Sequence, residues 1–330
     1  MSYTVSPYKP SGDIPIKYRQ PDAFDQEDPS RNVSDTLEIV DYIKDSHLRI
    51  WYNCQEDGYE THHHSAIEII YCIENGYTVT AGQKTFNLQE GEILIIPSHM
   101  IHRLLAQPKG ARFVMLIDPE PLMVFRDYKI VSPLFSQPMY LTARNHSGIY
   151  RYVADELQKA TDIYFENLPM WEMNVYARLI RVFAAIGKDF FRGSENFEIG
   201  ENNSHARVNY NKFADLLAMV DEHYPDDISL DEAADFVGFS KFHFSRLFKE
   251  YTGTTFYDHL LNRRIQAAEE LLNSNMSVTD VCYRTGFHSL TSFSRSFKQI
   301  TGFSPKEYRR YSEQYDSKQF STSIIKKNQA

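Results

Sequence analysis

A stretch in the C-terminal third of the chain repeats itself after 48 residues. The run Ser229–Phe239 matches the run Ser277–Phe287, and a glycine-phenylalanine pair closes both copies. After one extra residue in the second copy, Phe244-Ser-Arg-Leu-Phe-Lys249 matches Phe293-Ser-Arg-Ser-Phe-Lys298. A repeat of this length indicates one supersecondary unit used twice. This part of the chain is therefore expected to contain two copies of one small fold.

Each copy predicts two helices joined by a tight turn, which is typical of a helix-turn-helix. A serine three residues before an acidic residue predicts where the first helix begins, and a glycine predicts where it ends. These residues are Ser229, Glu232 and Gly238 in the first copy and Ser277, Asp280 and Gly286 in the second. Apolar residues at helical spacing predict the inward face of the second helix. They are Phe244, Leu247 and Phe248, then Phe293 and Phe297.

The opposite face of each second helix carries side chains that suit DNA. Arginine can donate two hydrogen bonds to guanine in the major groove, serine and threonine reach bases or phosphates, and lysine suits phosphates. The residues predicted to contact DNA are Phe242, Ser245, Arg246 and Lys249 in the first copy and Leu290, Thr291, Ser294, Arg295 and Lys298 in the second. Two alternatives stay open: the arginines form surface salt bridges, and Phe242 and Leu290 lie in the core.

Residues 210–311 resemble the DNA-binding domain of the AraC family of bacterial transcription regulators. The resemblance rests on Gly286-Phe287, on the Phe293–Lys298 run and on the run from Gly302 to Arg309. His259 departs from the tyrosine that is usual in the family, and Cys282 from the usual alanine. The resemblance implies that the outward residues of the second helices contact bases in double-stranded DNA.

Charge is distributed unevenly along the chain, which matters for a DNA partner. The net charge is −9, and residues 213–235 contain eight acidic residues and no lysine or arginine. Residues 236–311 carry 11 basic and six acidic residues. A locally basic surface can hold phosphates on an acidic protein, because salt screens charges beyond about 10 Å. The acidic run is either a solvated face or a contact for RNA polymerase.

The N-terminal part predicts a barrel or sandwich of short strands separated by turn signals. The predicted strands are 47–52, 66–73, 77–80, 84–88, 93–96 and 113–117. Two helices are predicted after them, over 149–164 and 175–190. An apolar stripe on the second helix is either domain packing or a dimer interface, and the family resemblance favours the dimer. The stripe consists of Val175, Leu179, Val182, Phe183 and Ile186.

Three histidines and a glutamate among the predicted strands form a candidate ligand site. Alternate residues of a strand share a face, so His62 and His64 are expected to point together with Glu68, and His63 to be exposed. His102 follows Gly91 and Pro97 in an order that, with His-x-His-x3-Glu, resembles the motifs of cupin barrels over about residues 45–118. Such a donor set suits a divalent metal.

Two interpretations of this site stay open. One is a metal-dependent cupin enzyme fused to a DNA-binding domain. The other is a sensor in which His62, His64, Glu68 and His102 contact a small-molecule effector, with no metal or other cofactor. Barrels joined to this DNA-binding domain usually act as sensors, so the resemblance favours the second. Imidazoles and a carboxylate with Trp51, Tyr71 and Tyr77 nearby favour a sugar as the effector.

The predicted fold class is α+β, with a cupin-like β-barrel, a helical linker and dimerisation pair, and an all-α domain with two helix-turn-helix motifs. A length of 330 residues suits about two domains. The expected boundaries are a flexible arm at 1–34, the barrel at 35–118, the linker and dimerisation helices at 119–207, the DNA-binding domain at 208–315 and a tail at 316–330.

The three cysteines, Cys54, Cys72 and Cys282, predict no disulfide framework and favour the cytoplasm. No apolar run is long enough to span a membrane, and the first ten residues show no secretory signal. The chain is thus predicted to be a homodimeric, effector-responsive and sequence-specific transcription regulator, an activator of a carbohydrate-utilisation operon. The alternatives are the metal-dependent enzyme and an architectural DNA binder without an effector.

Overall fold

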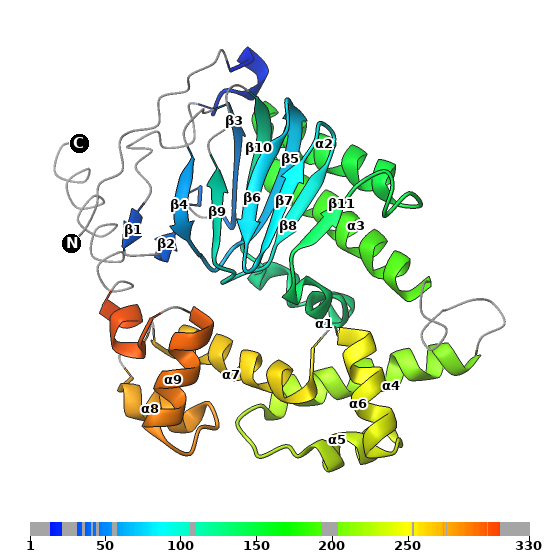
Figure 1. Cartoon of the computed structure of the whole chain (residues 1–330), viewed down its shortest axis with the longest axis vertical. Helices are drawn as coiled ribbons and strands as arrows, with labels where there is room; N and C mark the ends of the chain where they lie inside the picture. The colour runs from blue at the N-terminus through cyan, green and yellow to red at the C-terminus, as the bar shows by residue number, and fades with distance from the viewer. Residues whose placement is uncertain are drawn as a thin grey trace. The chain divides into compact units, whose positions relative to one another are not determined.

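Figure 1 shows the computed structural model of the chain. The structure describes residues 14–21, 32–34, 37–40, 42–43, 46–54, 58–105, 110–192, 204–252, 254–272, 274, 276–301 and 303–310. The chain divides into two units, one made of residues 1–214 and 251–253 and the other of residues 215–250 and 254–330. Most of the predicted arm at 1–34 and the whole predicted tail at 316–330 lie outside the described residues. The predicted domain boundaries remain predictions.

Two antiparallel sheets form the β-structure of the first unit (Figure 1). The five-stranded sheet has the order β11-β8-β5-β10-β3, and the four-stranded sheet has the order β4-β9-β6-β7. The strands are β3 (Leu48–Asn53), β4 (Tyr59–His62), β5 (Ile67–Glu74), β6 (Tyr77–Ala81), β7 (Lys84–Leu88), β8 (Ile93–Ile96), β9 (His102–Leu105), β10 (Ala111–Ile117) and β11 (Met139–Leu141). Strands β1 (Asn32–Ser34) and β2 (Leu37–Ile39) pair with each other.

Strand β5 is buried on both faces, which fixes the direction of Glu68. Ile67 and Ile69 belong to the core shared with the helices. Ile70 and Cys72 belong to a second core together with residues of β6, β8 and β9. Successive side chains of a strand point to opposite faces. Glu68 therefore points with Ile70 into the interior between the two sheets.

The six predicted strands are all present, with ends displaced by at most two residues. Sequence analysis missed β4, β9 and β11 among the strands of the two sheets. Strands β4 and β9 are rich in polar residues, namely histidine, glutamate and arginine. An amphipathic strand would instead alternate polar with apolar residues. His62 and His102 meet inside the barrel, whereas Glu60 and Arg103 are exposed. Polar residues thus stand where apolar residues normally mark the inward face of a strand.

Helices α2 (Tyr150–Glu166) and α3 (Trp171–Arg192) cover the five-stranded sheet (Figure 1). The apolar stripe of α3 is buried inside this unit, where Val175 and Val182 have no exposed surface and Ile186 is 3% exposed. The stripe packs with β-strand residues and with the short helix α1 (Arg126–Val131) in one core. The prediction that this stripe forms a dimer interface is therefore wrong, and the alternative of domain packing is the one observed.

The second unit is helical. Its elements are α5 (Leu230–Val237), α6 (Lys241–Thr252), α7 (Phe256–Leu272), α8 (Val278–Arg284) and α9 (Leu290–Thr301), and α4 (Ser204–His223) precedes them. Ser229 and Glu232 form the predicted reciprocal cap of α5, and Gly238 ends that helix with a left-handed φ of 71°. The hydroxyl of Ser277 accepts a hydrogen bond from the Asp280 amide at the start of α8. Among the described helices, none combines the length and apolar character needed to cross a membrane.

Glu269 on α7 gives the first testable prediction. Burial, assisted by the charge of Glu270, raises the pKa of the Glu269 carboxyl well above its usual range. The folded chain thus keeps a proton that the unfolded chain releases. The free energy of unfolding therefore falls as the pH rises above the pKa that Glu269 has in the unfolded chain. Glu269→Gln, which mimics the protonated form, is expected to stabilise the protein at pH 8 by roughly 1–3 kcal/mol. The gain should shrink towards pH 4 in thermal unfolding measured across this range. An equal gain at both pH values would contradict the titration.

Candidate functional site

The predicted DNA-contacting faces of α6 and α9 are open to solvent. In α6, Phe242 is 89% exposed, and Ser245, Arg246 and Lys249 are exposed. In α9, Leu290 is 39% exposed, Thr291, Arg295 and Lys298 are exposed, and Ser294 is half-buried. The alternative that placed Phe242 and Leu290 in the core is therefore wrong. The phenylalanines predicted to face inward, Phe244, Phe248, Phe293 and Phe297, are fully buried.

The arginines on these faces are not engaged elsewhere in the described part of the chain. Neither Arg246 nor Arg295 makes an ion pair or a hydrogen bond to a described residue. The alternative of surface salt bridges therefore has no support among these residues. Both guanidinium groups keep their full set of donors for a partner such as a guanine edge.

Helix α7 and the turn of the second copy both contact one short loop, which we call the 224–226 loop. On α7, the Arg264 side chain donates from Nε to the Tyr224 carbonyl at 2.8 Å and from Nη2 to the Asp226 carbonyl at 2.9 Å. Gly286, in the turn of the second copy, has a φ of +81°, and a Cβ there would lie 2.5 Å from the Pro225 carbonyl oxygen. Helix α7 and the turn of the second copy thus contact the same three residues, which lie just before the first copy in the chain.

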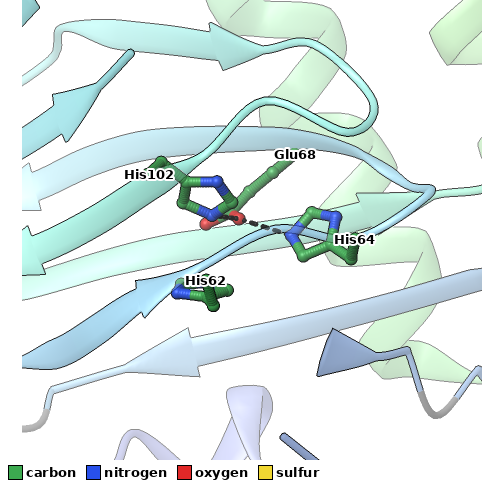
Figure 2. A group of neighbouring side chains, drawn as sticks. All are labelled: His62, His64, Glu68 and His102. Atoms are coloured by element: carbon green, nitrogen blue, oxygen red, sulfur yellow. Dashed lines mark hydrogen bonds and ion pairs between the residues drawn. The ribbon is translucent and has the colours of Figure 1, made fainter. Parts of the chain in front are cut away.

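Four buried side chains meet between the sheets of the first unit (Figure 2). His62 ends β4 and faces its register partner His102 on β9, while Glu68 comes from β5 and His64 from the link between β4 and β5. Each of the four is at most 2% exposed. Nε2 of His64 and Nε2 of His102 lie 3.0 and 2.9 Å from Oε2 of Glu68. The structure therefore brings together all four residues of the predicted ligand site.

The other ring nitrogen of each histidine is held by a backbone carbonyl. Nδ1 of His62 lies 2.7 Å from the Glu60 oxygen, Nδ1 of His64 lies 3.1 Å from the Ala66 oxygen and Nδ1 of His102 lies 2.7 Å from the Met100 oxygen. A carbonyl only accepts, so each Nδ1 carries the proton and donates it. The three Nε2 atoms consequently face the centre of the cluster.

Charge is concentrated on Glu68. Burial alone would raise the pKa of this carboxyl, but the charge of His102 and hydrogen bonds from His102 and His64 outweigh it and hold the pKa well below its usual range.

His63 was expected to be exposed, and this is wrong, because its side chain is 1% exposed. Burial lowers the pKa of His63 to about 4 and that of His99 to about 3. Both rings are neutral near pH 7.

The donor set fits a divalent transition metal. The ligand atoms of His62, His64, Glu68 and His102 all lie within 4.8 Å of one another. Metal bonds of about 2.0–2.2 Å place neighbouring ligand atoms roughly 3.0–3.5 Å apart, and the two nitrogen-to-oxygen distances to Glu68 fall at that spacing. Backbone acceptors that fix Nδ1 are the outer partners that metal-binding histidines require. Three imidazoles and one carboxylate suit zinc, iron, manganese or nickel better than calcium.

The aromatic residues expected beside the site belong to three different hydrophobic clusters. Tyr71 packs against the core next to the helices, Trp51 packs against a small cluster with Val40, and Tyr77 lies in the core between the sheets. The Arg112 guanidinium covers the Tyr77 ring at 3.7 Å. That these rings line a sugar-binding surface remains a prediction.

Comparison with known proteins follows the same division of the chain. Residues 48–150 match the model of an AraC-like ligand binding domain, and residues 233–311 match that of a helix-turn-helix domain. The HTH-type transcriptional activator AarP of Providencia stuartii is 30% identical over 112 residues, which cover 34% of this chain and 83% of AarP. The chain belongs to the AraC family of transcription regulators.

Other relatives of this AraC-family chain share smaller parts of it. An uncharacterized HTH-type transcriptional regulator of Staphylococcus aureus, SACOL0084, is 35% identical over 103 residues. This match covers 31% of the chain and only 14% of SACOL0084, and the chain matches 24% of several further S. aureus relatives. Among solved structures, the DNA-binding domain of AdpA in complex with a target DNA is 30% identical, covering 30% of this chain and 90% of that one, with a TM-score of 0.29. ToxT from Vibrio cholerae O395 is 11% identical, covering 80% and 96%, with a TM-score of 0.41.

Sequence analysis of this AraC-family chain missed one residue at the barrel site, Glu38 on β2. Its side chain is 7% exposed, and its Oε2 lies 3.3 Å from Nε2 of His62. Its amide donates to the carbonyl of His63 at 2.9 Å. No periodic pattern surrounds Glu38 in the sequence, so only the tertiary structure reveals that it joins the cluster.

Proposed function

We propose that the chain is a sequence-specific DNA-binding transcription regulator that responds to a ligand in its barrel. The observation that carries the proposal is the exposed arginine-lysine face that recurs on α6 and α9, on two helices whose opposite faces are fully buried. Within this proposal, the DNA contacts are Phe242, Ser245, Arg246, Lys249, Leu290, Thr291, Ser294, Arg295 and Lys298. The proposal has four more specific parts. The regulator is an activator that contacts RNA polymerase, it forms a homodimer, it lies in the cytoplasm, and it controls a carbohydrate-utilisation operon.

The regulatory step in this proposal is a shift between conformations. A ligand that binds one conformation of the barrel more tightly than another raises the population of that conformation. The difference between the two affinities limits how far the fraction of chains able to bind DNA can change. The residues offered for the ligand are His62, His64, Glu68 and His102. They supply imidazole and carboxylate groups, and such groups suit a metal ion or the polar groups of a small molecule.

An enzymatic role for the same cluster receives less support from the geometry. A catalytic metal centre keeps an open position for substrate. Here each of the four side chains is at most 2% exposed, and Glu38 lies against His62. A buried cluster of this kind suits a ligand that is held rather than turned over.

Selection of fragments of the source genome by the purified full chain tests the proposal. A regulator should enrich one recurrent motif with two major-groove contacts about one helical turn apart, and the enrichment should change when a pool of sugars or divalent metals is added. The absence of any enriched motif at about 50 mM salt, where electrostatic binding is strong, would contradict it. Enrichment without any ligand effect would favour an architectural DNA binder.

Lys249 and Lys298 give a prediction on the phosphate contacts. The double variant Lys249→Ala/Lys298→Ala is expected to weaken binding to all DNA alike and to reduce the slope of log K against log salt by about 2. Titrations of cognate and scrambled duplexes at several salt concentrations measure this slope. Lys188→Ala, an exposed lysine on α3, serves as the matched control. A loss confined to the cognate duplex would show that the lysines read bases instead.

A further inference from the structure

A groove of about 280 Å³ lies between α7 and α9 in the helical unit. Leu260 and Leu261 of α7, Phe287 of the turn before α9 and Ser292 and Ser296 of α9 are among the residues that line it. This volume is just below the roughly 300–1,000 Å³ of drug-sized sites, so it suits a ligand with a single ring. We propose that the groove binds a small organic acid that carries one ring.

The internal repeat accounts for the groove. Ser292 and Ser296 of the second copy correspond to His243 and Leu247 of the first copy. In the first copy, the ring of His243 packs on the ring of Phe239 with centroids 4.9 Å apart, and Leu247 has no exposed surface. The second copy keeps the phenylalanine but has a small hydroxyl side chain at both other positions. These two replacements remove a ring and an aliphatic side chain, and both serines line the groove.

The charge and the hydrogen-bond donors of the groove favour an anion. Arg264 lines it, and none of the described lining residues is acidic. The Arg264 guanidinium binds the 224–226 loop through Nε and Nη2, while its Nη1 bonds to no described residue. The hydroxyls of Ser292 and Ser296 likewise have no bond to a described side chain or carbonyl. A guanidinium and hydroxyl donors suit a carboxylate, which only accepts hydrogen bonds.

One carboxylate lies close to this site, and it is well solvated. Oδ1 of Asp227 lies 2.9 Å from Nε2 of His288, which lines the groove, and 3.8 Å from Nη2 of Arg264. The side chains of Asp227 and His288 are 71% and 79% exposed. Water and salt screen a charge that is exposed to this extent. The groove therefore keeps its preference for an anion.

Apolar and aromatic side chains provide a surface for the ring of the acid. Leu260 and Phe287 are nearly buried, at 5% and 6% exposed, while Tyr257 at the start of α7 is 58% exposed. An aromatic ring gains from contact with such side chains, and the few polar groups of a site fix its orientation. A ring that carries one carboxylate matches both parts of the lining.

The position of the groove gives an occupant a route to the DNA-binding helices. Arg264 and Gly286 both line the groove, and both also contact the 224–226 loop. An acid bound between α7 and α9 therefore touches the residues that hold this loop. The proposal goes beyond the response to a ligand in the barrel and does not depend on it.

Titration of the full chain with benzoate tests the proposal, with the leucine methyl groups labelled for NMR. Benzoate is expected to bind with a Kd on the order of 1 mM and to shift the methyl signals of Leu260 and Leu261 most. Benzamide keeps the ring without the charge and should bind about tenfold more weakly. Acetate and inorganic phosphate lack the ring and should leave both signals unchanged at the same concentration.

Three results of this titration would overturn the proposal. One is the absence of any shift with benzoate. Another is a set of shifts confined to leucines of the first unit, which would place the acid elsewhere. The third is an equal response to phosphate, which would indicate a site for a plain anion such as the DNA backbone.

A variant that restores the side chains of the first copy locates the site. Ser292→His/Ser296→Leu is expected to fill the groove and to weaken benzoate binding about tenfold or more, while the circular dichroism spectrum stays unchanged. If the double variant fails to fold, Ser296→Leu alone serves the same purpose. Gln299→His adds a similar side chain at an exposed position of α9 outside the lining and should bind benzoate as wild type does.

Unchanged affinity in a folded groove variant would contradict the proposal. All these measurements are made without DNA, so their failure is separate from failure of the genomic selection.

Discussion

Gly286→Ala is expected to destabilise the second helix-turn-helix by roughly 2–4 kcal/mol and to abolish specific DNA binding. Gly286 adopts a φ of +81°, a conformation that costs an alanine free energy before any contact is considered. The added Cβ would also lie 2.5 Å from the Pro225 carbonyl oxygen and 2.9 Å from Nε of Arg264. The carbonyl belongs to the backbone of the 224–226 loop, so the clash can be relieved only by moving backbone, either of that loop or of the turn at residue 286. Thermal unfolding and DNA titration of the full chain measure the two effects.

Gly238→Ala provides the matched control for this prediction. Gly238 occupies the equivalent turn of the first copy with a φ of 71°, so the substitution imposes similar backbone strain. It is expected to cost about 1 kcal/mol and to leave DNA binding measurable. If both variants lost the same stability, backbone strain alone would explain Gly286, and its close approach to the 224–226 loop would have no separate effect.

The double variant Arg246→Ala/Arg295→Ala is expected to lose about 2–6 kcal/mol of binding free energy on the cognate site, or about 30-fold to 10⁴-fold in affinity. Each guanidinium is exposed and has no described partner within the chain, so each is free to donate two hydrogen bonds to a guanine. The residues lie on separate helices, so their effects should add. Titration of cognate and point-mutated duplexes at one salt concentration should also show relaxed discrimination at two positions.

Arg192→Ala, which removes an exposed arginine at the end of α3, controls for the loss of positive charge. It should change neither affinity nor discrimination. Unchanged discrimination in the double variant would show that the two arginines contact phosphates, because phosphate contacts carry no sequence information.

The helical unit could be predicted closely because its signals are local. The Ser229 cap, the left-handed glycine at position 238 and the spacing of Phe244 and Phe248 each act within a few residues of sequence. Such signals place helix ends and buried faces without reference to the rest of the chain. The outward faces of α6 and α9 were predicted as the residues left over once the apolar residues had been assigned to the inward faces. Most of these residues are exposed in the structure.

The barrel was predictable only where its strands are rich in apolar residues. Apolar runs predict strands β5 and β8, whereas β4 and β9 carry histidines of the site and were missed. His63 is buried where distant segments meet the histidine run, since the Glu38 amide donates to its carbonyl and the His99 amide donates to that of His64. A period-2 pattern cannot predict such contacts. The stripe on α3 is equally apolar whether it meets a sheet or a second chain, so only the structure could assign it to the core. Glu38 joins His62 across 24 positions of sequence with no motif linking them.

The grip of Arg264 and Gly286 on the 224–226 loop has a consequence for how such a regulator changes its target. Because this loop, α7 and the turn of the second copy hold one another, the separation of α6 and α9 is set by residues that are not on their outward faces. New operator sequences can therefore arise by exchanging outward side chains alone, while the distance between the two half-sites is inherited unchanged. A regulator with altered spacing would instead require changes in the loop or in α7, outside the proposed DNA contacts.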